Sequence, residues 1–369
     1  MGWLDHEREI IEALRWRLLD WYGDNQRNLP WRGSGDPYAV WVSEIMLQQT
    51  RVAVVVERYA AFLSRFPNLE SLAAAPEQDV LALWSGLGYY RRARMLHKAA
   101  QFVVENHGGR LPATAAALRL LPGIGTYTAA AIASIAHDER VAVVDGNVER
   151  VLCRLYGWEA PARAGSSLLR RRIQAEADKL VDPRHPGDFN QAMMELGATV
   201  CTPRNPRCLA CPLATECATR GEHRTGPRPR MLSQQVACAL VLRTGSPSGP
   251  AAKIVTREVL LEQRSPEQTV MPDLWELPAL REVEVPDADL RMTVRHAIMQ
   301  TNYYVRVRNV AEEEVDALTV PGGRRCWVSL AQAGGMALTG LTRKVLTRAH
   351  LLPTVHLQAL AQKVELEVS

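Results

Sequence analysis

Residues 121–128 read Leu-Pro-Gly-Ile-Gly-Thr-Tyr-Thr, and they join two segments whose apolar residues recur at helical spacing. Gly123 and Gly125 allow a tight turn there, which leaves backbone N–H groups unpaired at the start of the second helix. Such groups bind phosphate with no preference for a base, because the helix dipole and the free donors both favour an anion. The sequence alone leaves a second interpretation open, in which the glycines serve only an ordinary connection between helices.

Around this turn, the sequence up to about residue 221 predicts an all-α region. Apolar residues keep helical spacing, the breaks fall at Gly, Pro and Asn, and period-two alternation is almost absent. The clearest predicted helices cover residues 41–51, 52–65, 91–106, 126–136, 147–156 and 189–200.

The pattern changes near residue 221, where a stretch rich in Pro, Gly and Arg predicts a linker. Beyond the linker, short runs with strand character follow at residues 236–242, 258–262 and 303–309, and a closing helix is predicted at 341–351. We therefore predict a multidomain chain of α and α+β class. Its domains are an all-α domain at residues 1–220, a linker at 221–234, and an α+β domain at 235–369.

Composition excludes several classes of protein. The chain has 369 residues, is 47% hydrophobic and carries a net charge of +4, so it can bury a sizeable core and is not disordered as a whole. The mild positive charge permits binding to nucleic acid without requiring it. The longest uncharged stretch, residues 120–137, is too short and too polar to span a membrane. The first residues do not resemble an export signal, so a cytoplasmic location is expected.

Four cysteines fall close together with the spacing C-x6-C-x2-C-x5-C, which is typical of a metal site in a cytosolic chain. Zinc sites usually show two C-x2-C pairs, so the single pair here favours a four-thiolate iron–sulfur cluster, with zinc as the alternative. Between the first two cysteines, Arg204 and Arg207 lie on a short loop that is held at both ends and is suited to contact phosphates. The cysteines are Cys201, Cys208, Cys211 and Cys217.

Two carboxylates are candidates for chemistry. Asp145, in the run Val-Asp-Gly-Asn-Val, opens a predicted helix and is either a simple helix cap or a fixed anion that faces a cationic centre. Glu44 lies within a predicted helix, where the simplest interpretation is a solvated side chain.

In combination, these motifs resemble the helix-hairpin-helix DNA glycosylases that carry an iron–sulfur cluster. The runs WVSEIMLQQTRV at 41–52, GLGYYRRARMLHKAA at 86–100 and FNQAMMELGATVC at 189–201 resemble the MutY-type adenine glycosylases, which remove adenine mispaired with 8-oxoguanine. The resemblance covers nearly all of the first 220 residues. It implies base-excision repair on double-stranded DNA that contains an adenine mispair, and a [4Fe-4S] cluster on the four cysteines. We expect a monomer.

The resemblance also implies roles for particular residues in breaking the N-glycosidic bond. Glu44 would protonate the adenine ring, Asp145 would lie beneath the developing sugar cation, and Asn147 would help to hold the site. Tyr127 stands at the hairpin position where endonuclease III-type glycosylases carry a lysine that forms a Schiff base. A phenol cannot form one, so a monofunctional glycosylase is expected.

The target base must leave the helical stack before it can react. Gln49 and Tyr89 match the intercalating residues of the family, although aromatic residues such as Tyr89 more often pack in a core. Trp31 and Arg32 are candidates for the base pocket.

The second domain carries a weaker resemblance. Residues 260–264 and 273–278 resemble the Nudix-like C-terminal domain of the same family, which recognises 8-oxoguanine across the pair. The sequence lacks a Nudix box with its metal-binding glutamates, so pyrophosphate hydrolysis is not expected. Where the family often carries Phe-Ser-His, this chain has Ile298, Met299 and Gln300, which retain an apolar wedge and a hydrogen-bonding amide for recognition of the opposite base.

Two competing functions are weaker. A bifunctional glycosylase and lyase acting on oxidised pyrimidines conflicts with Tyr127 in place of lysine and with the Nudix-like extension. A non-catalytic DNA-binding protein held together by its cluster conflicts with the presence of both Glu44 and Asp145 at their family positions.

Overall fold

A computed structural model of the chain describes residues 3–159, 167–223, 230–245 and 256–352. The chain divides into two compact units. The first comprises the described parts of residues 1–74 and 95–228, and the second comprises residues 75–94 together with the described part of 229–369. Within the described chain, no helix has both the length and the apolar character that a membrane crossing requires.

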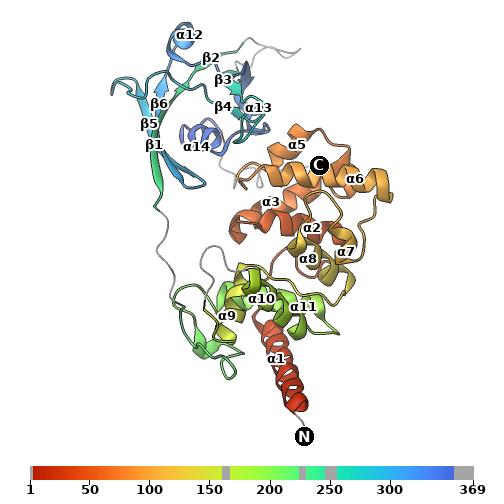
Figure 1. Cartoon of the computed structure of the whole chain (residues 1–369). Coiled ribbons are helices and arrows are strands. Elements are labelled where there is room, and N and C mark those ends of the chain that lie inside the picture. The colour runs from red at the N-terminus through yellow and green to blue at the C-terminus, as the bar shows by residue number, and fades with distance from the viewer. Residues whose placement is uncertain (1–2, 160–166, 224–229, 246–255, 353–369) are drawn as a thin grey trace, which may run out of the picture. The chain divides into compact units, whose positions relative to one another are not determined.

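The first unit is helical, as predicted (Figure 1). Each of the six helices predicted in this region is present, with ends that differ by a few residues. The elements from residues 1–74 are α1 (Trp3–Asn25), α2 (Pro37–Leu47), α3 (Val52–Arg65) and α4 (Leu69–Ala73). Those that follow are α6 (Arg91–His107), α7 (Ala115–Leu118), α8 (Thr126–His137), α9 (Gly146–Leu155), α10 (Ser167–Leu180), α11 (Pro186–Thr199) and the 3-10 turn η1 (Cys208–Ala210). The first residues of α6, up to Arg94, belong to the second unit.

Helix α2 is buried along most of its length, and this places a carboxylate in the interior. Asp36 caps the helix by accepting a hydrogen bond from the N–H of Tyr38 at 3.0 Å, and Pro37 fixes the backbone of the first turn. Residues 38–46 are all buried, and the helix packs against α3 and α8. Glu44 is therefore only 5% exposed, and the interpretation of a solvated side chain is wrong.

The turn at 121–125 depends on a glycine for two reasons. Gly123 has a φ of +75°, which favours glycine, and a Cβ there would lie 2.7 Å from the Cβ of Met95. Gly125 then occupies the N-cap of α8 with extended backbone and no side-chain cap. Among the described residues, the side chain of the N-cap position therefore satisfies none of the first N–H groups of α8.

The second unit combines residues 75–94 with an α+β region, so the predicted class of the C-terminal part is confirmed (Figure 1). Its strands are β1 (Leu232–Leu240), β2 (Leu242–Thr244), β3 (Arg257–Gln263), β4 (Trp275–Glu276), β5 (Leu290–Ile298), β6 (Thr301–Asn309) and β7 (Arg324–Ser329). Its helices are α5 (Glu77–Leu83), α12 (Val315–Leu318), α13 (Leu330–Gly334), α14 (Gly340–Arg348) and the 3-10 turn η2 (Glu312–Glu314).

The strands form two sheets. In one, β1 runs parallel to β6 and β5 pairs with β6 in antiparallel fashion. In the other, β3 pairs in antiparallel fashion with β2, β4 and β7. Apolar residues of both sheets and of α14 share one core that includes Val294, Val305, Leu261, Val328 and Leu346.

Residues 75–94 join this unit through polar contacts. The hydroxyl of Tyr90 donates to the carbonyl of Leu338 at 2.9 Å, and Nε of Arg343 donates to the hydroxyl of Ser85 at 2.6 Å. Strand β1 begins at residue 232, inside the segment 221–234 that the sequence predicts as a linker. The domain limits at 220 and 235 stay a prediction.

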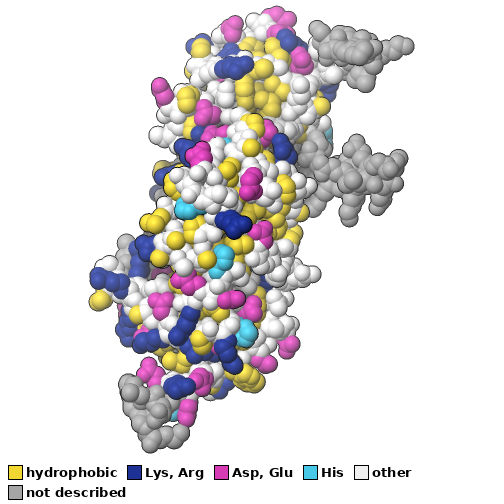
Figure 2. Space-filling view, turned by 90° about the vertical axis from the view of Figure 1, so that its right-hand side faces the viewer, with side chains coloured by type: hydrophobic (Ala, Val, Ile, Leu, Met, Phe, Trp, Pro, Cys, Tyr) yellow, Lys and Arg dark blue, Asp and Glu magenta, His cyan; other side chains and the backbone are white. Residues whose placement is uncertain are grey.

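The face shown in Figure 2 has no broad surface of a single charge. Lys and Arg side chains are interspersed there with Asp and Glu side chains. Binding of an anionic partner at this face would therefore depend on local groups and not on a broad basic surface.

Helices α9 and α11 approach each other closely, and this contact is testable. A Cβ at Gly197 would lie 2.6 Å from the Cβ of Asn147 and 3.1 Å from its backbone. We expect Gly197→Ala to lower the free energy of unfolding by about 1–3 kcal/mol, the usual cost of overpacking. The control is Gly23→Ala in α1, where nothing lies within 4 Å and alanine should raise stability by about 0.5–1 kcal/mol. Urea denaturation measures both, and equal midpoints for the two variants would contradict the close approach.

Candidate active site

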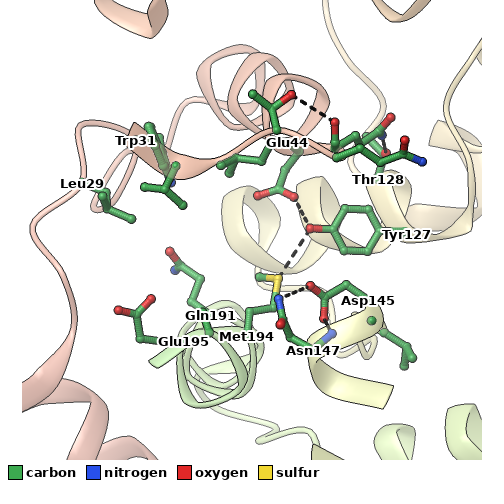
Figure 3. Close-up of a pocket in the computed structure, with 18 of the residues that line it drawn as sticks. Leu29, Trp31, Glu44, Tyr127, Thr128, Asp145, Asn147, Gln191, Met194 and Glu195 are labelled. Carbon is green, nitrogen blue, oxygen red and sulfur yellow. Dashed lines mark hydrogen bonds between the residues drawn. The ribbon is translucent and has the colours of Figure 1, made fainter. Parts of the chain in front are cut away.

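One cavity of about 770 Å3 in the first unit collects most of the residues that the sequence singles out (Figure 3). Its walls come from α2, the 121–125 turn with the start of α8, the start of α9, and α11. The predicted residues that line it are Trp31, Arg32, Glu44, Gln49, Gly123, Gly125, Tyr127, Asp145 and Asn147.

Glu44 and Tyr127 contact each other directly in the lining of this cavity. The phenol hydroxyl donates to Oε2 of Glu44 at 2.5 Å and lies 3.5 Å from the sulfur of Met194 (Figure 3). Burial raises the pKa of Glu44 to about 7, with the charge of Asp145 adding to the rise and the bond from Tyr127 opposing it. A carboxyl group with a pKa near 7 is suited to exchange a proton at neutral pH.

Asp145 serves as the N-cap of α9 and also lines the cavity. Its Oδ1 accepts from the backbone N–H groups of Asn147 at 2.8 Å and Val148 at 2.7 Å. Its Oδ2 accepts from Nδ2 of Asn147 at 2.9 Å (Figure 3). The two interpretations offered by the sequence are therefore compatible, because the cap contacts fix the carboxylate at the cavity wall.

A third carboxylate, Glu195 on α11, lies in the same cavity with a different environment. It is 1% exposed and accepts from Nε of Arg27 at 2.6 Å and from Nη2 of Arg32 at 2.6 Å. Burial alone would raise the pKa of Glu195, but the hydrogen bonds and charges of the two arginines hold it below its ordinary value. Environment therefore separates the proton affinities of Glu44 and Glu195.

Trp31 and Arg32 form the wall beside this carboxylate. Trp31 is 7% exposed and packs edge-on against the ring of Tyr59 with centroids 5.5 Å apart. Arg32 lies 5.1 Å above the ring of Tyr22, and its Nη1 is buried with no hydrogen-bond partner among the described residues. This donor is available to an acceptor on a bound molecule.

The sequence predictions missed the contribution of α11. Gln191, Met194, Glu195 and Ala198 all line the cavity, and their spacing places them on one face of a helix. The sequence of residues 189–201 already showed this helical spacing. The polar residues Gln191 and Glu195 among apolar ones could therefore have indicated a face that lines a cavity. Arg27 carried no signal, because it precedes α2 in a connection without regular spacing.

The four cysteines line a second cavity, and none of them forms a disulfide. Buried Arg154 donates to the sulfur of Cys201 at 3.3 Å, and the backbone N–H of Arg220 donates to the sulfur of Cys217 at 3.5 Å. Within the described residues, no three His, Cys, Asp or Glu side chains are grouped to hold a metal ion. The four thiols nevertheless line one cavity, with N–H groups directed at two of the sulfurs.

Arg150 ties the cysteine loop to the first cavity. Its Nε donates to the carbonyl of Cys201 at 2.8 Å, and its Nη2 donates to Oδ1 of Asn147 at 2.8 Å. Asn147 in turn donates to Asp145. A chain of hydrogen bonds through Arg150 and Asn147 therefore links the orientation of Asp145 to the loop that carries Cys201.

The remaining predicted residues lie outside the first cavity. Arg204 and Arg207 are exposed on the cysteine loop, where Arg207 donates to the carbonyl of Thr199 at 2.7 Å. Tyr89 belongs to the second unit and is 51% exposed with a φ of +46°. Residues 298–300 form the tip of the β5–β6 hairpin, where Met299 is 75% exposed with a φ of +52°.

The sequence of this chain matches a known protein family. Residues 42–174 match the family described as "HhH-GPD superfamily base excision DNA repair protein". An adenine DNA glycosylase of Mus musculus is 37% identical over 402 residues, which cover 91% of this chain and 77% of that protein. The adenine DNA glycosylase of Homo sapiens is 50% identical over 224 residues, which cover 58% of this chain but only 41% of that protein.

Among solved structures, that of a thermostable thymine-DNA glycosylase is 28% identical, with a TM-score of 0.53. The match covers 58% of this chain and 98% of the other. The helical part of the chain therefore has a helix-hairpin-helix glycosylase fold.

Two substitutions at Asp145 distinguish the contribution of its helix-cap hydrogen bonds from that of its charge. Asp145→Asn keeps an oxygen for the N–H groups of Asn147 and Val148, so we expect stability within about 0.5 kcal/mol of the parent, whereas Asp145→Ala should lose about 1 kcal/mol. Urea denaturation of both variants tests this. If Asp145→Asn were as destabilised as Asp145→Ala, the cap would not be what holds this side chain.

Proposed function

We propose that this chain, which belongs to the adenine DNA glycosylase family, hydrolyses the N-glycosidic bond of adenine mispaired with 8-oxoguanine or guanine in double-stranded DNA. The observation that carries the proposal is the arrangement of one cavity. A buried carboxyl group with a pKa of about 7 lies on one wall, and a carboxylate held by three hydrogen bonds lies on another.

Glu44 is the proton donor in this proposal. Cleavage of the bond between the sugar C1′ and the base leaves the bonding electron pair on adenine, so a proton on a ring nitrogen makes adenine a better leaving group. A group with a pKa of about 7 retains its proton in a large fraction of molecules at neutral pH and gives it up readily. The hydrogen bond from Tyr127 stabilises the ionised carboxylate that remains.

Asp145 stabilises the sugar. As the bond breaks, positive charge develops on C1′ and the ring oxygen, and a nearby carboxylate lowers the energy of that cation. The cap contacts hold the carboxylate in place before the reaction, so little reorganisation is needed. Water then adds to C1′ and loses a proton, which leaves an abasic site.

The base pocket is built from Trp31, Arg27, Arg32 and Glu195. The indole supplies an apolar wall for a planar base, and Nη1 of Arg32 supplies a donor for a ring nitrogen. Glu195, held ionised by two arginines, supplies acceptors for an exocyclic amino group. Adenine presents these complementary groups on its edge.

Binding to duplex DNA uses local groups of the first unit. The unpaired N–H groups at the start of α8 suit a phosphate, and Arg204 and Arg207 add positive charge on the cysteine loop. Gln49, which lines the cavity and has a φ of +55°, would fill the space that a flipped adenine leaves.

The C-terminal region reads the opposite base in this proposal. Its α+β architecture and the runs at 260–264 and 273–278 support a Nudix-like domain. The hairpin tip at Ile298, Met299 and Gln300 offers an exposed apolar side chain next to an amide, which suits insertion beside a base and hydrogen bonding to it.

Cys201, Cys208, Cys211 and Cys217 would hold a [4Fe-4S] cluster. When bound, the cluster would supply a rigid cross-link within the loop 201–217, and none of the steps above passes through it. Arg150 would transmit that rigidity to Asn147 and Asp145 through the hydrogen bonds described above.

Two substitutions test the assigned roles. Glu44→Gln keeps the size of the side chain but cannot donate the proton of an acid, and Asp145→Asn removes a charge while keeping the helix cap. We expect each to lower single-turnover adenine release from an adenine:8-oxoguanine duplex by at least about 100-fold while duplex binding is retained. Alkaline strand cleavage reports the abasic product.

The control for that assay is the same duplex with adenine opposite thymine, which should remain intact. Release from adenine:thymine at the rate of the mispair, or full activity in Glu44→Gln, would contradict the proposal.

The phenol at residue 127 yields a second test. A glycosylase that uses an amine nucleophile forms an imine that borohydride reduces to a stable protein–DNA link. Because Tyr127 carries no amine, we expect no covalent product after borohydride treatment, and strand cleavage only after alkali. Efficient trapping of DNA on the protein would instead indicate a lyase.

A further inference from the structure

The loop that presents Tyr89 has an unusual backbone. Gly86, Gly88 and Tyr89 have φ values of +99°, +70° and +46°. The first two are glycines, for which this conformation costs little, but for a tyrosine it costs about 1–2 kcal/mol. Tyr89 is nevertheless 51% exposed, so its own packing does not account for the conformation.

Arg92 forms hydrogen bonds to this loop. Its Nη2 donates to the carbonyls of Leu87 at 3.0 Å and Gly88 at 3.1 Å. Its backbone N–H donates to the carbonyl of Tyr89 at 2.8 Å, which starts α6 directly after the loop. One residue therefore bonds to three successive carbonyls of the loop.

The guanidinium of Arg92 also stacks with two rings. Its central carbon lies 5.4 Å from the centroid of the Trp84 ring and 5.7 Å from that of the Tyr89 ring. Trp84 is fully buried, and its Nε1 donates to the carbonyl of Gly88 at 3.1 Å. Trp84 thus anchors the cation, and the cation supports the exposed ring of Tyr89.

Burial lowers the pKa of Arg92 to about 10, and the group still carries its charge at neutral pH. The stack and the carbonyl bonds therefore act together under physiological conditions. Lysine has neither the planar face nor the paired donors for both contacts.

We propose that Arg92 is the positioning residue that holds Tyr89 in the conformation in which its ring enters the base stack of the DNA. This inference rests on the proposed function, because it assumes a duplex from which a base is expelled. A ring held before binding loses less conformational freedom when it inserts, so more of the binding energy opposes the cost of unstacking.

The test uses a fluorescent base to report insertion separately from chemistry. 2-Aminopurine is placed next to the mispair, and its fluorescence rises when the neighbouring base is unstacked. All binding measurements use the Glu44→Gln background, in which adenine stays attached. Arg92→Leu should reduce the fluorescence rise at saturating protein to less than half, and Tyr89→Ala should do the same. Single-turnover adenine release, measured with Glu44 intact, should fall about tenfold or more for each.

Arg91→Leu is the matched control, because Arg91 is exposed, directly adjacent and of equal charge. It should leave the fluorescence rise and the release rate within about twofold of the parent. The double variant Arg92→Leu/Tyr89→Ala should lose no more than Tyr89→Ala alone, since without the Tyr89 ring the loop that Arg92 holds has no side chain to insert.

Arg92→Lys tests whether the effect of Arg92→Leu comes only from a loss of folding. It keeps the charge but not the planar stack, so its release rate should fall while its thermal midpoint stays near that of the parent. Equal behaviour of Arg92→Leu and Arg91→Leu, multiplying losses in the double variant, or full activity of Arg92→Lys would overturn the inference. Failure of the proposed function is distinguishable, because the parent protein would then release no adenine.

Discussion

The hydrogen bond from the Tyr127 hydroxyl to the Glu44 carboxyl is the interaction on which the rest of this site depends. Burial of Glu44 favours its neutral form, and the hydrogen bond from Tyr127 offsets part of that effect by stabilising the ionised form. Both side chains must therefore be carried into the interior. The burial of α2 does this for Glu44, and the glycine turn at 121–125 does it for Tyr127 by starting α8 at the cavity wall.

The opposite wall depends on a different constraint, the contact of α9 with α11. Gly197 lets α11 approach the backbone of Asn147, so the cap of α9 and the acceptor Glu195 share one cavity. Arg150 extends this contact to the cysteine loop through the carbonyl of Cys201. The cysteine loop and the two helices thus form one hydrogen-bonded support for Asp145, which explains how a site of separate segments keeps its geometry.

Much of this architecture was predictable from local patterns. The helices, the α+β class of the C-terminal part and the residues of the turn follow from periodicity and from glycine chemistry. Glu44 shows the limit, because a carboxylate in a helix is usually solvated, and the apolar residues around it indicate a buried helix without showing that this side chain faces a cavity. Arg27 shows another limit, since its partner Glu195 is distant in the chain and neither residue signals the other. The grouping of residues 75–94 with the C-terminal region depends on contacts such as that of Tyr90 with Leu338, which no local pattern predicts.

The most direct test of the central claim is the pH dependence of single-turnover adenine release in the parent and in Tyr127→Phe. The proton donor must be protonated, so the rate should fall tenfold per pH unit above about 7 in the parent. Loss of the phenol removes a stabiliser of the ionised carboxylate, which raises the pKa of Glu44 and should move the fall about one pH unit higher. A fall at unchanged or lower pH in Tyr127→Phe, or a rate that rises through pH 7 in the parent, would contradict the account.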